Sequence, residues 1–256
     1  MDTVTSRDGT RIAFDRIGSG APLIFVLGAF NDRGTGQGLA QWLSDAFTVY
    51  SYDRRGRGDS SDTLPYSVDR EVEDLQAVIQ TARGEADVFG FSSGAVLALR
   101  AAHQGLKIGR LALYEPPPTN SQAALEHAET LAQLIADGNR GDAVEYFQRD
   151  IVGMPAEVVA QMRQSPFRPA LEAMAHTLEY DMRILSEPRG VGNLQTPTLI
   201  ISGEDSMGSD KLNQAAHALA NALPHAQHKT LNGLNHDLVP EALGPELKRF
   251  FGAEAA

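Results

Sequence analysis

The chain has 256 residues, of which 42% are hydrophobic and 21% are charged. This balance fits one soluble globular domain with a large core and excludes an intrinsically disordered chain. The net charge of -11, with no cluster of lysine and arginine, argues against a nucleic-acid partner, and the absence of cysteine excludes disulfides and thiol catalysis.

The N-terminal residues MDTVTSRDGT do not combine a positively charged start with an apolar stretch, so we expect no signal peptide. No apolar run approaches the roughly 20 residues that cross a bilayer. We therefore expect a soluble, cytoplasmic protein without a membrane partner.

Short apolar runs bounded by glycine and proline alternate with longer segments of helical period, which is typical of parallel strands covered by helices. Runs such as PLIFVL and TPTLIIS are apolar on both faces, as in strands buried between helix layers. RIAFDRI alternates and follows the turn-like RDG, so we expect it in an antiparallel hairpin near one sheet edge. The expected strands are 11–17, 23–27, 48–52, 86–89, 111–114, 198–202 and 228–231.

Between Glu115 and Pro197 helical patterns replace the strands. One helix is expected from Ser121 to Gly138, a second from near Asp142, and a third from about residue 169 to 185. We interpret residues 119–190 as a helical cap inserted into a core made of residues 1–118 and 191–256.

The segment GFSSG satisfies G-x-S-x-G, with an apolar run before it and a helical run after it. A strand that reverses sharply into a helix strains its corner residue, and Gly90 and Gly94 would remove the side chains that collide there. Ser92 then projects as the reactive serine. The amide of Ser93 lies in the first helical turn, where an anion is favoured. The plain alternative is a glycine-bounded helix start with a capping serine.

At this motif the chain resembles the α/β-hydrolase superfamily, and the resemblance covers essentially the whole length. Five segments match in the family's order: PLIFVLGAF, SYDRRGRGDS, GFSSG, TPTLIISGED and LNGLNHD. The resemblance implies an α/β fold with a mostly parallel sheet of about eight strands, flanking helices and an inserted cap. It also implies an oxyanion hole made by the amides of Ala29 and Ser93. Most members have His-Gly before that loop, where this chain has Leu27-Gly28, but a backbone donor needs no side chain.

A serine nucleophile needs a base, and His236 is the histidine that follows the last strand in a loop, where the order serine, acid, histidine expects it. The alternative is a surface histidine that caps the helix beginning near Pro240.

The acid has two candidates. The family usually places it three residues beyond the glycine that ends the seventh strand, a position that here holds Ser206, with Asp205 one residue away. Glu115, at the end of the strand after the elbow helix, is similar to the acid of a subset that includes lactone-cleaving members such as zearalenone hydrolase. We favour Glu115 and keep Asp205 as the alternative.

Two other motifs give weaker evidence of function. We interpret DRRGRG, residues 53–58, as a structural turn held by its own salt bridges. Gly34, Gly36 and Gly38 do not complete a dinucleotide-binding pattern, because Leu39 holds the third glycine position. No histidine cluster suggests a metal, so we expect no cofactor.

Together these features predict a cofactor-independent serine hydrolase that cleaves an ester or lactone of a small, mostly apolar substrate. Carbon–carbon bond hydrolysis, amide cleavage and perhydrolysis stay open as reactions, and so does the oligomeric state. Two alternatives also stay open: a ligand-binding protein that keeps the fold but does little chemistry, and a lyase that uses His236 as base without an acyl-enzyme.

Overall fold

The computed structural model describes residues 1–188, 192, 194–204 and 209–252. In these residues one mixed sheet has eight strands in the order β1-β2-β4-β3-β5-β6-β7-β8. The pairs β1/β2 and β2/β4 are antiparallel, and the other neighbours are parallel. The strands are β1 (Asp2–Thr5), β2 (Arg11–Ile17), β3 (Ala21–Val26), β4 (Phe47–Tyr52), β5 (Ala86–Phe91), β6 (Ile108–Tyr114), β7 (Thr198–Gly203) and β8 (Ala226–Leu231).

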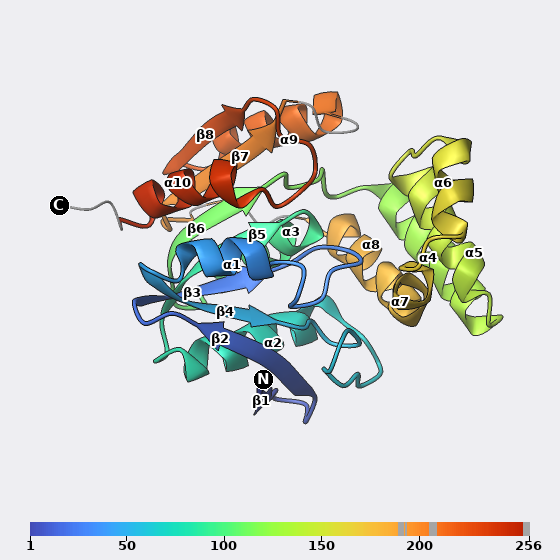
Figure 1. The fold of residues 1–256 in the computed structure, drawn as a ribbon, viewed down its shortest axis with the longest axis horizontal. Coiled ribbons are helices and arrows are strands. Elements are labelled where there is room, and N and C mark those ends of the chain that lie inside the picture. Colours follow the sequence, from blue (N-terminus) through green and yellow to red (C-terminus); the bar gives the residue numbers. More distant parts are fainter. Residues whose placement is uncertain (189–191, 193, 205–208, 253–256) are drawn as a thin grey trace.

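Helices cover both faces of this sheet, as Figure 1 shows. On one face, α2 (Val68–Thr81), α3 (Ser93–His103) and α9 (Ser209–Ala222) pack into a core with alternate strand residues. On the other, α1 (Gln37–Leu43) and α10 (Pro240–Phe250) enclose a second core. The central strands are therefore apolar on both sides, and the predicted α/β fold with its mostly parallel sheet is confirmed. The antiparallel hairpin predicted for residues 11–17 is also present, its partner being β1.

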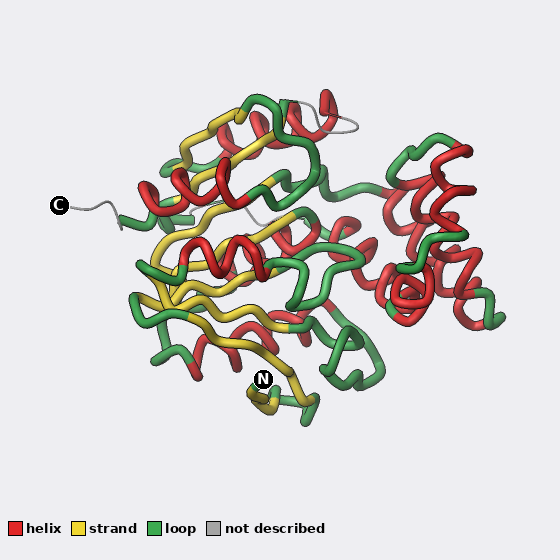
Figure 2. The backbone as a smooth tube through the Cα atoms, viewed as in Figure 1, coloured by secondary structure: helices red, strands yellow, loops and turns green. Residues whose placement is uncertain are grey.

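A run of helices joins β6 to β7 and lies beside the sheet (Figures 1 and 2). It has its own apolar cluster, which also includes Ala29 and Phe30 at its margin. The elements are α4 (Gln122–Ala136), α5 (Arg140–Tyr146), a π-helix (Phe147–Ile151), α6 (Ala156–Arg163), α7 (Arg168–Ala173), a 3₁₀ turn (Ala175–Thr177) and α8 (Leu178–Ser186). We call this run the helical segment, and its division from the core stays a prediction.

Two helix predictions in the helical segment were wrong in detail. The single helix expected from about residue 169 to 185 is broken into α7, a 3₁₀ turn and α8. Arg140 donates to the carbonyls of Glu172 and Ala173, at 2.6 Å each, and so occupies acceptors that a continuous helix would use. The helix expected from near Asp142 begins at Arg140 and changes to a π-helix at Phe147.

Candidate active site

The turn between β5 and α3 carries Ser92. Its backbone has φ 54° and ψ -127°, a conformation that L-residues rarely adopt. A Cβ on Gly90 would lie 2.6 Å from the Cα of Ala95, and a Cβ on Gly94 would lie 2.2 Å from the carbonyl oxygen of Val26. Both glycines are therefore required by space, as the sequence predicts, and they let the corner close tightly around Ser92.

The loop after β3 lies directly against this corner. A Cβ on Gly28 would be 2.8 Å from the Cβ of Ser92 and 3.3 Å from its Oγ. The next residue, Ala29, follows within the same loop, and Ser93 is the first residue of α3, where helix amides lack an intrahelical acceptor. The structure thus brings the segments of both predicted oxyanion donors to Ser92, the serine that the sequence predicts to be reactive.

Glu115 follows β6 and is fully buried. Its Oε1 accepts the amide N–H of Gly203 at 3.0 Å, and its Oε2 is hydrogen-bonded to Nδ1 of His236. A buried carboxylate needs such partners to offset its lost hydration. Because Glu115 takes the Nδ1 side of the ring, Nε2 is left as the acceptor that a general base requires.

Two aromatic residues of the sheet, Tyr114 and Phe91, contact the loop that carries His236. The Tyr114 hydroxyl donates to the carbonyl of Asn235 at 2.6 Å, and burial, with Glu115 second, raises the pKa of Tyr114, so the donor stays protonated. The His236 ring lies 4.7 Å from that of Phe91, the residue before Ser92.

Among the described residues no hydrogen bond joins Ser92 to His236. Hydrogen bonds between a nucleophile and its base often tighten only when substrate is bound.

Asp205, the alternative acid, lies outside the described residues. In the part of the chain that is described, no group of three or more potential metal ligands occurs, and no helix is long and apolar enough to span a membrane.

The sequence matches the profile of the alpha/beta hydrolase family over residues 10–243. The chain belongs to this family. The family resemblance drawn from the five segments is therefore confirmed.

Known proteins match this alpha/beta hydrolase chain along almost its whole length. An alpha/beta hydrolase structure from Sphaerobacter thermophilus has 46% identity and a TM-score of 0.89, over 98% of this chain and 100% of that one. A pimeloyl-[acyl-carrier protein] methyl ester esterase from Xanthomonas campestris is 29% identical, over 90% of this chain and 96% of its own length. A non-heme haloperoxidase from Rhodococcus erythropolis is 26% identical, over 93% of each chain.

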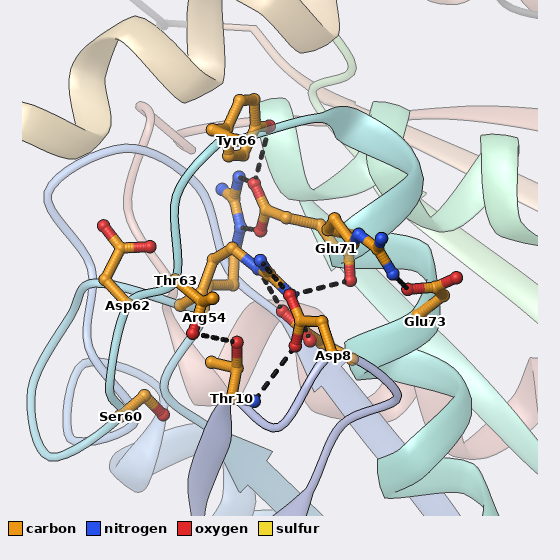
Figure 3. Close-up of polar contacts among 12 residues, drawn as sticks. Asp8, Thr10, Arg54, Ser60, Asp62, Thr63, Tyr66, Glu71 and Glu73 are labelled. Atoms are coloured by element: carbon orange, nitrogen blue, oxygen red, sulfur yellow. Dashed lines mark hydrogen bonds and ion pairs between the residues drawn. The ribbon is translucent and has the colours of Figure 1, made fainter.

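The DRRGRG loop of this alpha/beta hydrolase differs from its prediction. Its arginines do not pair with Asp53, whose carboxylate instead binds Arg33. Arg54 makes a two-pronged pair with Glu71 of α2, at 2.7 Å for both contacts, and Glu71 also accepts from the Tyr66 hydroxyl at 2.9 Å (Figure 3). The turn is structural, but its counter-charges come from α2, from α8 and from Asp8 before β2, so the expectation of salt bridges within the loop was wrong.

Sequence reasoning also missed Asp181 of α8. This carboxylate is fully buried and accepts from the Ser93 hydroxyl at 2.6 Å, from Arg54 at 2.7 Å and from Arg57 at 2.8 Å. Burial alone would raise the pKa of Asp181, but Arg57, Arg54 and the Ser93 hydroxyl together outweigh burial and hold the pKa below its ordinary value. The sequence offered one signal for a buried acid, which is an acidic residue between Tyr180 and Met182. The structure shows that both of these neighbours are buried.

Proposed function

We propose that this alpha/beta hydrolase cleaves carboxylic esters or lactones of small, mostly apolar molecules through Ser92, His236 and Glu115. The observation that carries the proposal is the contact between the buried Glu115 carboxylate and Nδ1 of His236, made beside the strand end that bears Ser92. The esterase named among the relatives, at 29% identity over 90% of this chain, supports the ester class.

In the proposed reaction, His236 Nε2 removes the proton from Ser92 as its oxygen attacks the ester carbonyl. The amides of Ala29 and Ser93 stabilise the oxyanion, and His236 then protonates the leaving alcohol. Water, activated by the same histidine, releases the acid and restores the serine. Throughout the cycle Glu115 keeps the imidazole in the productive tautomer and stabilises its cation.

A panel of p-nitrophenyl esters of graded acyl length, assayed beside a set of lactones, tests the reaction class and the size of the pocket together. Labelling with a fluorophosphonate probe tests the nucleophile. We expect rapid labelling and turnover in the wild type, and loss of both in Ser92→Ala and His236→Ala. Ser44→Ala, at the half-buried serine that follows α1, is the matched control and keeps both.

Two outcomes would contradict the proposal. A well-folded wild type that is neither labelled nor active would favour a ligand-binding protein. Appreciable turnover in Ser92→Ala would favour a lyase that uses His236 without an acyl-enzyme.

A further inference from the structure

The loop that carries the proposed oxyanion donor Ala29 is held from behind by two buried arginines. Arg54 donates to the carbonyl of Leu27 at 3.2 Å, and Arg57 donates to the carbonyl of Gly28. Both side chains are at most 2% exposed. Hydrogen bonds from a charged donor in such a dry environment are among the stronger ones that a protein makes.

The contact to Gly28 has a direct geometric consequence for Ala29. The carbonyl of Gly28 and the N–H of Ala29 belong to one peptide unit, which is trans. In a planar trans peptide these two groups point in opposite directions. Fixing the carbonyl on Arg57 therefore aims the amide N–H of Ala29 away from Arg57, and the pull of the guanidinium on the carbonyl strengthens that N–H as a donor.

The conformation of the loop is one that needs such support. Phe30 has φ 59°, which costs a residue with a side chain about 1–2 kcal/mol. The Asn31 side chain donates to the carbonyl of Ala29 at 2.6 Å, and the Asn31 amide donates to Gly28 at 3.4 Å. Strained loops persist where neighbouring groups fix them from several directions, and Arg57 is the charged member of this set.

Asp181 joins this loop to the serine turn. Its Oδ2 binds Arg57, while its Oδ1 binds Arg54 and the hydroxyl of Ser93. The Asp181 carboxylate thus contacts the side chain of Ser93, whose amide is one proposed oxyanion donor. It also contacts Arg57, which holds the peptide of the other donor, Ala29. We infer that Arg57, held by Asp181, is a positioning residue that aims the Ala29 amide at the oxyanion; this inference rests on the proposed function.

Arg55 offers a matched control for Arg57. It lies in the same loop, its side chain is as fully buried, and it pairs with Asp74 at 2.7 Å and Asp8 at 3.0 Å. Its other contact is the carbonyl of Arg70, so it supports α2 and the N-terminal hairpin and not the loop after β3. Arg57→Lys and Arg55→Lys remove comparable buried pairs, and only the first withdraws support from Gly28.

The first measurement is steady-state kinetics on the best ester. A lysine at 57 is too short to serve both Asp181 and Gly28, so we expect kcat to fall about tenfold to hundredfold with KM changed less than about threefold. Losing a whole oxyanion donor costs about 10²–10³. Arg55→Lys should lower stability with little change in kcat. Asp181→Asn, which keeps the volume, should lower kcat in the same way and serves if Arg57→Lys does not fold.

The second measurement does not depend on turnover. Labelling glycine carbonyls with ¹³C and alanine amides with ¹⁵N selects the Gly-Ala pairs 20–21, 28–29, 94–95 and 252–253. We expect the Ala29 amide proton to shift upfield in Arg57→Lys and Asp181→Asn and to stay in place in Arg55→Lys. An unmoved Ala29 resonance, or a loss of kcat no larger than in Arg55→Lys, overturns the inference. A wild type without Ser92-dependent turnover overturns the proposed function, and the resonance still decides the positioning.

Discussion

At the scale of single residues, the candidate site depends on buried charges that each have defined partners. Glu115 has no exposed surface, has φ 49°, and binds both a backbone amide of β7 and His236. A carboxylate held in this way has a fixed direction, because its two oxygens have separate tasks. Replacing Glu115 is therefore expected to change the orientation of His236 and to leave the protein surface unchanged.

Glu115→Gln should lower kcat about 10²–10⁴-fold, because an amide neither stabilises the imidazolium nor enforces the tautomer. Asp205→Asn, one residue before the acid position that is usual in the family, should stay within about twofold of wild type. Steady-state kinetics on one ester checks both variants, with circular dichroism to establish folding. The reverse pattern, with Asp205→Asn inactive and Glu115→Gln active, would make Asp205 the acid.

A second residue prediction concerns His176, a residue of the helical segment that faces Asp62 of the core. Its Nδ1 is 2.8 Å from Arg140 and its Nε2 is 3.6 Å from Asp62. Burial, and then Arg140, lower the pKa of His176 below its ordinary value of 6.5. The unfolded chain therefore binds more protons just below that value, so stability falls as the pH drops from 7.

His176→Gln removes this contribution. The free energy of unfolding, measured with urea at pH 7 and at pH 5, should fall less in the variant than in the wild type. An equal fall in both proteins would show that His176 does not contribute to the pH dependence.

Residue chemistry also limits what the sequence could predict. Ser92 and His236 could be found because strand, turn and loop patterns mark them locally. Glu115 could be favoured because it lies at the end of the strand after the elbow helix, where a lactone-cleaving subset of the family carries its acid. The link from Asp181 to Ser93 spans 88 residues, and the pairing of Arg57 with Gly28 uses a backbone carbonyl that no sequence pattern marks.

At the scale of elements, close packing of α3 on β3 fixes the serine turn. The start of α3 approaches β3 so closely that Gly94 nearly touches the carbonyl of Val26. Glycine is otherwise a poor helix residue, so its presence here reflects space and not helix propensity.

Gly94→Ala should lower the free energy of unfolding by about 2–3 kcal/mol, because backbone has to move to admit the methyl group. Gly38→Ala is the matched control, since Gly38 also lies in a helix but its Cβ would meet only Pro240 at an ordinary 3.5 Å. That variant should gain up to about 1 kcal/mol from helix propensity. Urea midpoints check both, and equal effects of the same sign would refute the steric argument.

The elements also show where sequence patterns stop being informative. The buried strands could be predicted because short, wholly apolar runs such as PLIFVL, bounded by glycine or proline, are typical of strands covered on both faces. β1 was missed because it is four residues long and mostly exposed. The breaks between α7 and α8 were missed because they depend on Arg140, more than 30 residues away, and no glycine or proline marks them.

At the scale of the whole molecule, buried apolar residues are unevenly distributed between the sheet and the helical segment. Two large apolar clusters fill the faces of the sheet, whereas the helical segment has one smaller cluster of its own. Segments with fewer buried apolar contacts open at lower free energy than the main core. The helical segment is therefore expected to open before the sheet does.

Native-state hydrogen exchange tests this expectation. Amides of α4 to α7 should exchange through openings of lower free energy than amides of β3 and β5, by at least about 2 kcal/mol. A single common free energy for all of these elements would mean that the chain opens as one unit, and the division at residues 119–190 would then lack support.

The place of Glu115 has a consequence for how this fold diversifies. If Glu115 supplies the acid from the end of β6, as we propose, turnover does not require an aspartate after β7. A lineage that passed through a stage with both carboxylates could exchange one for the other without an inactive intermediate. Substitutions in the turn following β7 could then change binding specificity without loss of the triad acid, both in evolution and in protein engineering.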